Sequence, residues 1–575
     1  MSKTLGAIGA TQRSGAPGNM RTGGQILVDQ LRIHGADLAF CVPGESYLAV
    51  LDALYDARDE IPLIVCRHES GAANMAEAYG KLTGRPGICF VTRGPGATNA
   101  SIGVHTAFQD STPMILFIGQ VGRDMIEREA FQEIDFRRMF GQMAKWVAQI
   151  DDPERIPEYV ARAFQTATSG RPGPVVLALP EDMLTEAAAA VDAARYAPAQ
   201  AHPGAAEMAR LRELLAQAKR PLLIVGGGGW SAPATADIKH FVEANNLPIA
   251  CAWRRQDSFD NHHPNYIGTV GLGMDPLIAE RVKAADLLIV VGPRLGEMTT
   301  GGYTLLDVPR PRQGLVHVQP GAEELGRVYQ PVLGINASPA HFAAAARTLA
   351  PVDHKAWAAS VVEARQQYLV NLKHRPSPGT LDMGEVMAEL RARLPADAIL
   401  CNGAGNYAVW AHRFYQFREF GTQLAPTSGA MGYGVPAAVA AKIMHKKRLV
   451  ICFSGDGCFL MTGQELATAV QYRANVVFLV INNGMYGTIR MHQEREYPGR
   501  VSGTDLVNPD FAAYARAFGA QGEIVERTAD FAPAFARALA ADRPALIELR
   551  IDPEAISPRT TLSEIREQAL AKAGA

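Results

Sequence analysis

The sequence predicts an α/β protein built from three doubly wound domains, each with a parallel sheet. Its 575 residues are too many for one hydrophobic core, since single cores stop growing beyond roughly 250–300 residues. Short apolar runs alternate with helix-like segments along most of the chain, which is typical of repeated βαβ units. Two polar stretches containing proline, 182–203 and 351–380, interrupt this rhythm and predict linkers.

The apolar runs assign strands to each predicted domain. A first domain is expected over residues 20–185, after a loose arm at 1–19. A central, Rossmann-like domain is expected over 204–350, and a third over 381–555. The first and third are the most alike in rhythm. The expected strands are Leu38–Val42, Leu63–Cys66, Gly87–Thr92, Met114–Ile118 and Val175–Leu179, then Pro221–Val225, Ala285–Val291 and Gly314–Val318, and finally Ala398–Cys401, Leu449–Phe453, Val476–Ile481 and Ala545–Ile551.

Composition argues against several classes of function. Lys and Arg number 56 against 58 Asp and Glu, so the charge balance gives no support for nucleic acid or an anionic membrane as partner. The seven cysteines lie mostly in apolar runs and form no CxxC pair, which favours buried thiols in a reducing compartment. With neither a charged-then-apolar leader nor an apolar run near 20 residues, a cytoplasmic protein is expected.

The strongest local pattern lies in the third domain. A buried strand ends in Ser454-Gly455-Asp456-Gly457, and the next strand, after an expected helix over Thr462–Arg473, ends in Asn482-Asn483. Asp456 and Asn483 are one strand–helix–strand repeat apart, so both would lie at the carboxyl edge of the sheet, where open α/β sheets bind ligands. Glycines and a helix N-terminus there suit phosphate, and a carboxylate plus an amide oxygen suits Mg²⁺. Either half alone would be an ordinary turn, but together they predict a cofactor site.

This pattern resembles the diphosphate-binding signature of thiamine-diphosphate (ThDP) enzymes. The resemblance implies that Mg²⁺ is bound by Asp456, Asn483 and the Met485 carbonyl. It also implies that the Gly429 carbonyl accepts from the cofactor's 4′-amino group and that Met431 forces the bent cofactor conformation, although core packing is the plain alternative for Met431. Further cofactor contacts are expected at Gly405, Asn406, Tyr407, Gly455, Gly457 and Cys458.

An acid in the first domain completes the predicted site. Glu69 follows a strand and begins a helix, where a carboxylate is also common as a simple cap. The segment RHESGAANMAEAYGKLTGRPG resembles the pyrimidine-binding domain of the same family, which gives Glu69 the catalytic role beside the pyrimidine N1′. The family resemblance further implies that Glu69 of one subunit meets Asp456 of another, so a homodimer or homotetramer is expected.

Within this family the first domain is most similar to acetolactate synthase. The stretches RGPGATN (93–99), AFQEID (130–135) and Lys145-Trp146 carry the similarity, which implies that Phe131 and Gln132 line the substrate pocket. His492 stands where a Trp is usual, and Glu45 stands where decarboxylases often carry Asp. Gln319 and Gly321 stand where FAD binders have two aspartates, so the sequence leaves open whether FAD is bound. It also leaves open whether Arg254 and Arg255 face a phosphate or are solvated.

The sequence therefore predicts decarboxylation of a small 2-oxoacid followed by carboligation to a second carbonyl, of a 2-oxoacid or an aldehyde. A 2-oxoacid decarboxylase that releases aldehyde, or an aldehyde lyase, is the alternative. A cofactor-binding regulatory subunit is less favoured, because such a protein need not keep Glu69. A dehydrogenase is also less favoured, because the glycine-rich central domain has no GxGxxG with a downstream acid.

Overall fold

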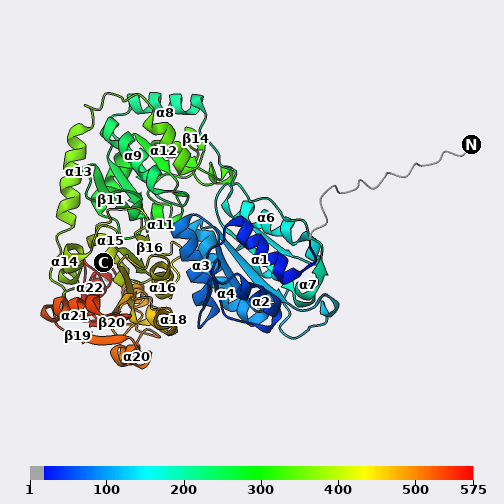
Figure 1. Ribbon diagram of the computed structural model, residues 1–575. Coiled ribbons are helices and arrows are strands. Elements are labelled where there is room, and N and C mark those ends of the chain that lie inside the picture. Colours follow the sequence, from blue (N-terminus) through cyan, green and yellow to red (C-terminus); the bar gives the residue numbers. More distant parts are fainter. Residues whose placement is uncertain (1–18, 574–575) are drawn as a thin grey trace, which may run out of the picture.

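The computed structural model describes residues 19–573 and contains three six-stranded sheets, all parallel, in consecutive parts of the chain (Figure 1). This confirms the predicted fold class. Residues 1–18 of the expected N-terminal arm lie outside the described residues. The sheets span residues 39–180, 221–336 and 399–550, so each predicted domain range encloses one of them. The domain boundaries themselves stay predictions.

The first sheet has the order β3-β2-β4-β5-β7-β6, with helices on both faces. Its strands are β2 (Ala39–Cys41), β3 (Leu63–Val65), β4 (Gly87–Val91), β5 (Met114–Gln120), β6 (Trp146–Gln149) and β7 (Pro174–Pro180). The helices are α1 (Gly23–His34), α2 (Leu48–Asp56), α3 (Glu69–Thr83), α4 (Gly94–Asp110), α5 (Phe136–Phe140), α6 (Ile156–Thr168) and α7 (Glu181–Thr185). Sequence analysis missed β6, whose residues are only partly apolar.

The central sheet has the order β11-β10-β9-β12-β13-β14. Its strands are β9 (Pro221–Val225), β10 (Ile249–Ala252), β11 (Tyr266–Val270), β12 (Leu287–Val291), β13 (Gly314–Gln319) and β14 (Leu333–Asn336). Its helices are α8 (Ala205–Gln217), α9 (Ala232–Asn245), α10 (Pro276–Ala284), α11 (Glu297–Thr300), α12 (Pro339–Arg347) and α13 (Ala358–Asn371).

The third sheet has the order β16-β15-β17-β18-β20-β19. Its strands are β15 (Ile399–Asn402), β16 (Gln423–Leu424), β17 (Val450–Gly455), β18 (Val477–Asn482), β19 (Gln521–Val525) and β20 (Ala545–Arg550). The helices are α14 (Met383–Arg393), α15 (Tyr407–Phe414), α16 (Gly434–Met444), α17 (Asp456–Leu460), α18 (Leu466–Gln471), α19 (Gly487–Glu496), α20 (Phe511–Ala517), α21 (Thr528–Ala540) and α22 (Leu562–Ala573).

Strand order separates the central domain from the other two. When the strands are renumbered from one within each domain, the first and third sheets both read 2-1-3-4-6-5, whereas the central sheet reads 3-2-1-4-5-6. The similar rhythm predicted for the first and third domains is therefore confirmed. The central order is that of dinucleotide-binding folds. Ligands bind in open α/β sheets where the strand order reverses, and each sheet has such a reversal beside its first strand. The reversals lie between β2 and β4, between β9 and β12, and between β15 and β17.

The first and third domains share one hydrophobic core. Helices α3, α4 and α16 pack together, and their buried residues form a single cluster with apolar residues from both sheets. Small residues make the close approach of α3 and α4 feasible: a Cβ at Gly103 on α4 would meet the Cβ of Ala73 on α3. In Figure 1, α3 and α4 accordingly border the third domain, with the central domain above.

Three sequence expectations need correction. The stretch 351–380 is not simply a linker, because it contains α13, a helix of 14 residues. The stretch 182–203 is not a free linker, because Ala187–Ala188 (β8) pairs with Arg21–Thr22 (β1) and Asp192 accepts from Arg21 and Gln30. The helix expected over Thr462–Arg473 is broken: α17 begins at Asp456 itself, and a 3-10 turn at Gly463–Glu465 precedes α18.

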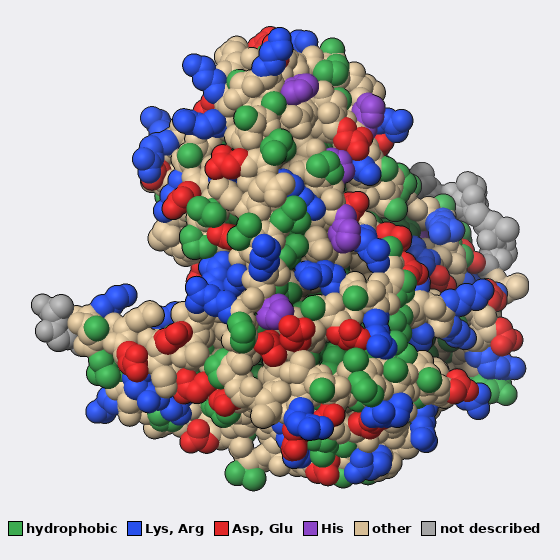
Figure 2. All heavy atoms as spheres, turned by 90° about the vertical axis from the view of Figure 1, so that its left-hand side faces the viewer, with side chains coloured by type: hydrophobic (Ala, Val, Ile, Leu, Met, Phe, Trp, Pro, Cys, Tyr) green, Lys and Arg blue, Asp and Glu red, His purple; other side chains and the backbone are tan. Residues whose placement is uncertain are grey.

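Other expectations agree with the structure. All seven cysteines are free and buried, as predicted. Figure 2 shows Lys and Arg side chains interspersed with Asp and Glu over the face it presents, in keeping with the balanced net charge. Within the described residues, none of the helices combines the length and apolarity needed to cross a bilayer.

Candidate functional site

A cavity of about 240 Å³ lies at the reversal point of the third sheet. The loops after β15, β17 and β18 form its walls, and all eleven predicted cofactor-binding residues line it. The full lining comprises Ala404, Gly405, Asn406, Tyr407, Trp410, Gly429, Met431, Gly455, Asp456, Gly457, Cys458, Ile481, Asn483, Met485, Tyr486, Gly487, Thr488, Ile489, Ile551, Ala555 and Ile556.

The buried Asp456 carboxylate is held by backbone and side-chain donors. Its Oδ1 accepts from the Gly457 amide at 2.9 Å, and its Oδ2 accepts from the Gly484 amide at 3.0 Å and from Asn508 Nδ2 at 2.8 Å. Burial raises the pKa of Asp456, and these three donors act against that rise. Because the donors fix both oxygens, the carboxylate has one orientation at the end of β17.

The two asparagines after β18 differ in their surroundings: Asn482 makes hydrogen bonds within the domain, and Asn483 lines the cavity. Asn482 binds inward, accepting from the Gly484 amide at 3.0 Å and donating to Glu548 at 2.8 Å. Asn483 lines the cavity, and its Oδ1 accepts from the Met485 amide at 3.3 Å. β17 and β18 are adjacent strands, so the strand–helix–strand spacing brings Asp456 and Asn483 to one edge, as the sequence predicted.

The charge of the cavity wall restricts what it can bind. Among the lining residues that the structure describes, Asp456 is the only Asp, Glu, Lys, Arg or His. A diphosphate would therefore find no Lys or Arg here, and its charge would have to be met by a cation and by backbone amides. The oxygen donors of Asp456, Asn483 and Met485 fit Mg²⁺, which takes few protein ligands and keeps phosphate oxygens and water. No cluster of three His, Cys, Asp or Glu suited to a metal occurs in residues 19–573.

The two glycines flanking Asp456 face aromatic rings. A Cβ at Gly455 would lie 2.7 Å from the Tyr407 ring, and one at Gly457 would lie 2.6 Å from the Tyr486 ring. From the sequence, these glycines were expected only to let phosphate approach the backbone. The structure shows that they also admit the two rings that wall the cavity.

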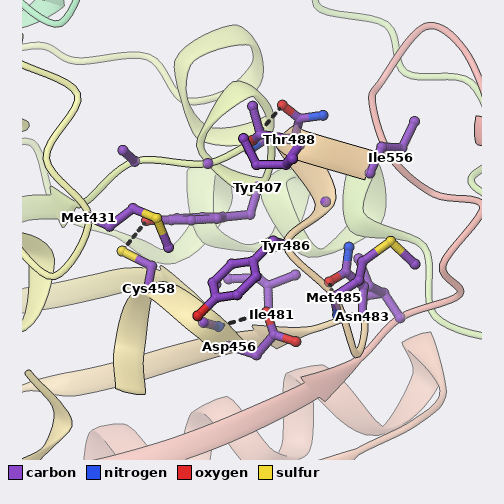
Figure 3. Close-up of a pocket in the computed structure, with 18 of the residues that line it drawn as sticks. Tyr407, Met431, Asp456, Cys458, Ile481, Asn483, Met485, Tyr486, Thr488 and Ile556 are labelled. Atoms are coloured by element: carbon purple, nitrogen blue, oxygen red, sulfur yellow. Dashed lines mark hydrogen bonds between the residues drawn. The ribbon is translucent and has the colours of Figure 1, made fainter. Parts of the chain in front are cut away.

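The remaining predicted contacts are tied together by hydrogen bonds. Asn406 donates its amide to Thr488 Oγ1 at 2.9 Å, which joins the loop after β15 to α19. Cys458 Sγ accepts from the Tyr407 hydroxyl and the Gly432 amide, both at 3.2 Å. In Figure 3, Met431 and Cys458 lie toward one end of the cavity, and Asn483 and Met485 lie toward the other. Gly429 has φ +71° and open space where a Cβ would stand.

Sequence analysis missed the apolar part of the lining. Ile551, Ala555 and Ile556 come from the segment that follows β20, and Trp410 comes from α15. Apolar residues at these positions are indistinguishable from core residues in a sequence. Tyr486 and Gly487 lie three and four residues after Asn483, so that neighbourhood was the one signal that could have found them.

Glu69 does not reach this cavity within the chain. It begins α3 on the first domain, half-buried, and its Oε2 accepts from Asn99 Nδ2 at 3.0 Å. Its other oxygen faces α4, 3.5 Å from where a Cβ of Gly96 would lie. Glu69 therefore lies on the first-domain face near the reversal between β2 and β4.

Phe131 and Gln132 lie on the same first-domain face. The Gln132 carbonyl accepts from the Gly94 amide at 2.9 Å, and its φ of +65° is unusual for a residue with a side chain. Phe131 is 71% exposed, and the buried Arg93 lies 6.0 Å from the centre of its ring. Arg93 also donates to Glu45 at 2.9 Å. The structure thus gathers the first-domain candidates, but apart from the third-domain cavity.

A second large cavity, of about 530 Å³, lies at the reversal point of the central sheet. Gly227 follows β9 there, Arg294 follows β12, and α4 and the Thr427–Gly429 segment close it from the other domains. Arg255 lines this cavity and Arg254 is buried against the Pro426 carbonyl, so neither is solvated. Gln319 does not face the cavity, because its amide donates to the Gly292 and Pro293 carbonyls at 2.7 Å. His263 is buried and His262 exposed.

Family models of thiamine pyrophosphate enzymes match all three domains. The N-terminal TPP binding domain matches residues 21–139, the central domain 208–346, and the C-terminal TPP binding domain 403–549. The third match includes the whole of the loops that follow β15, β17 and β18.

Similar curated proteins extend over nearly the full chain. An acetolactate synthase large subunit of Parasynechococcus marenigrum is 34% identical, covering 92% of this chain and 87% of its own length. The same-named subunit of Corynebacterium glutamicum is 32% identical, over 96% and 90%. An Escherichia coli acetolactate synthase isozyme 2 large subunit is 31% identical, over 92% and 95%.

Proposed function

The chain belongs to the thiamine pyrophosphate enzyme family, and on that premise we propose that it decarboxylates a small 2-oxoacid and joins the remaining fragment to a second carbonyl. One observation carries the proposal. A single cavity gathers every predicted cofactor contact around one buried carboxylate, with no Lys or Arg in its described wall. Such a wall suits a diphosphate bound through Mg²⁺.

Each residue of the cavity has a proposed task. Asp456, Asn483 and the Met485 carbonyl would hold Mg²⁺, and the amides near Gly457 would bind phosphate oxygens. The Gly429 carbonyl would accept from the aminopyrimidine, against which Met431 packs. Bound thiamine diphosphate supplies an electron sink for the electrons released when a bond next to a carbonyl breaks.

Glu69 would hold a proton at the pyrimidine of a cofactor bound by a second copy of the chain. This assignment follows from its position, on a first-domain face with Phe131 and Gln132 and apart from its own chain's cavity. A symmetric dimer would create two such composite sites, and a tetramer could contain two dimers. Phe131 and Gln132 would then contact the substrate.

Pyruvate is the proposed donor, since the relatives are named acetolactate synthases. The test is product analysis with pyruvate, ThDP and Mg²⁺. We expect acetolactate and one CO₂ for each pair of pyruvate molecules. Acetaldehyde with one CO₂ for each single pyruvate would contradict the carboligation, and no CO₂ from any of a panel of 2-oxoacids would contradict decarboxylation.

Release of an aldehyde is a second candidate outcome, and Glu45 is the observation that favours it. Glu45 follows β2 at the reversal point of the first sheet, and its side chain is 65% exposed although Arg93 holds one of its oxygens. A carboxylic acid facing the substrate could supply the proton that releases an aldehyde. Glu45→Ala should then raise the ratio of ligated product to aldehyde. An unchanged ratio would remove this role.

We extend the proposal to FAD in the central cavity. The cavity lies at the reversal point of a sheet with the dinucleotide-binding order, and the Arg255 and Arg294 side chains that line it could meet a diphosphate. Gln319 would take no part, since its amide is turned away. The purified protein should then be yellow and release flavin on denaturation, whereas a colourless protein that binds no added FAD would contradict this part.

A further inference from the structure

The turn that presents Glu69 is fastened to the third domain of its own chain. Between the end of β3 and the start of α3, the amides of Val65, Arg67 and His68 all donate to third-domain side chains. Val65 donates to the Tyr472 hydroxyl at 2.8 Å. Arg67 and His68, the two residues that directly precede Glu69, both donate to Glu465.

Glu465 is the central acceptor of this contact. Its Oε1 accepts from the Arg67 amide at 3.1 Å and from the His68 amide at 3.0 Å. Its Oε2 accepts from the Thr468 hydroxyl at 2.6 Å, and the side chain is fully buried. A buried carboxylate with three donors is fixed in orientation, since losing any donor leaves part of its charge unsatisfied.

Gly71 provides the space that the Glu465 carboxylate needs. A Cβ at Gly71 would lie 2.6 Å from Glu465 Cδ and 2.9 Å from its Cγ. Any larger residue at position 71 would therefore push the carboxylate away from the turn. Gly71 has ordinary helical backbone angles in α3, so this packing, and not backbone freedom, is what requires glycine here.

We propose that Glu465 is a positioning residue for catalysis, which sets the location of the Glu69 carboxylate by clamping the Arg67 and His68 amides. Glu465 touches neither the cavity nor Glu69, so it acts only through the turn. Because the clamp belongs to the third domain, the first-domain acid keeps its place only while the two domains of one chain stay packed together. The proposal rests on the proposed role of Glu69 beside the cofactor.

The test measures how fast the C2 proton of bound ThDP exchanges with deuterium, which requires no 2-oxoacid. Glu465→Gln keeps the shape of the side chain but removes the charge that holds both amides. We expect the exchange rate to fall by about 10- to 100-fold, because a displacement near 1 Å costs about that much. Gly71→Ala should lower the rate similarly. ThDP affinity should stay within about threefold in both variants, since neither residue lines the cavity.

Asp257→Asn is the matched control. Asp257 is also a buried carboxylate that joins two domains through backbone amides, those of Gly421, Thr422 and Gln423, but it lies away from the Glu69 turn. This variant should lose stability like Glu465→Gln and keep its exchange rate.

The outcomes separate the two proposals. A Glu69→Gln variant with normal exchange would overturn the proposed role of Glu69. Slow exchange in Glu69→Gln, with normal exchange in folded Glu465→Gln and Gly71→Ala, would overturn the positioning role alone. ThDP affinity that falls in parallel with the exchange rate would also overturn it, because Glu465 would then merely support the fold. In the Gly71→Ala/Glu465→Ala double variant, the second change should add little to the first.

Discussion

The cavity of the third domain and the face of the first domain lie at equivalent places in two sheets with the same strand order, yet they differ in how their side chains are surrounded. Around Asp456 the chain supplies the loops after β15, β17 and β18 and the apolar segment after β20 as walls. Around Glu69 it supplies an open face, on which Phe131 is 71% exposed. The composite site proposed above would bring a second copy of the chain against this face. On the proposed function, the difference means that one chain contributes to two separate sites, through its cavity to one and through its first-domain face to the other.

Removing Asp456 should have the largest effect, because it eliminates the only charged group of the described cavity wall. We expect Asp456→Ala to weaken Mg²⁺-dependent ThDP binding by more than about 100-fold, since even outer partners of a metal are worth about 10- to 100-fold. Trp410 lies in the wall, so quenching of tryptophan fluorescence reports binding. Glu496→Ala, exposed at the end of α19, is the control. Unchanged affinity in Asp456→Ala would remove the cavity as the cofactor site.

Glu69→Gln should separate the contribution of the first-domain face to turnover from that of the third-domain cavity to cofactor binding. We expect kcat to fall by about 10²- to 10⁴-fold, the usual contribution of a positioned acid or base, with ThDP affinity nearly unchanged. The first-domain face would lose its proton donor while the cavity stays intact. A fall in affinity as large as the fall in kcat would place Glu69 in binding instead.

Coexpression of the Glu69→Gln and Asp456→Ala chains tests the composite site directly. In a mixed dimer, one site would combine the intact Asp456 of one copy with the intact Glu69 of the other. Random mixing should then restore about one quarter of the wild-type activity. Persistent inactivity of the mixed dimers would show that both residues act within one chain.

Lys81→Met should destabilise the packing of the first domain against the third. Lys81 has its side chain 2% exposed, pairs with Glu77 at 3.0 Å and with Asp110, and donates to the Ala425 carbonyl of the third domain at 3.1 Å. Breaking such a buried network costs about 3–5 kcal/mol, which should appear as a lower urea midpoint. Arg138→Met removes a pair whose Arg side chain is 91% exposed, and should cost less than about 1 kcal/mol. Equal midpoints in the two variants would contradict the role of the network.

The smallest expected effect concerns pH and the contact between α19 and α22. Glu494 on α19 accepts from Arg566 on α22 at 2.6 and 2.7 Å, which with its other donors lowers the pKa of Glu494 to about 2. A lowered folded-state pKa stabilises the protein above the ordinary value of 4.5. That stabilisation is lost as the pH falls from there through about 2. Proteolysis of α22 should therefore accelerate in that window, and Arg566→Met should weaken the pH dependence, since Arg490 and the Gly499 amide still act on Glu494.

Particular residues show how far the sequence could predict the site. Asp456 and Asn483 were predictable because strand ends and loop spacing are local, and parallel strands bring their carboxyl ends together whatever else the fold does. Trp410 and Ile556 were not predictable, because an apolar side chain has the same signature whether it packs in a core or lines a cavity. Glu465 carried no signal either, since a Glu inside an expected helix looks solvated, whereas the helix is broken and the side chain is buried.

The sequence by itself determined three parallel-sheet domains, the residues at their strand ends and the family to which the chain belongs, because all of these follow from periodicity and short motifs. Only the tertiary structure decided that Glu69 accepts from Asn99, that Gln319 turns away from the central cavity, and that Glu465 accepts from the amides of the turn before Glu69. These are contacts between residues far apart in the chain, and their energies depend on how helices of different domains pack, which no local pattern records.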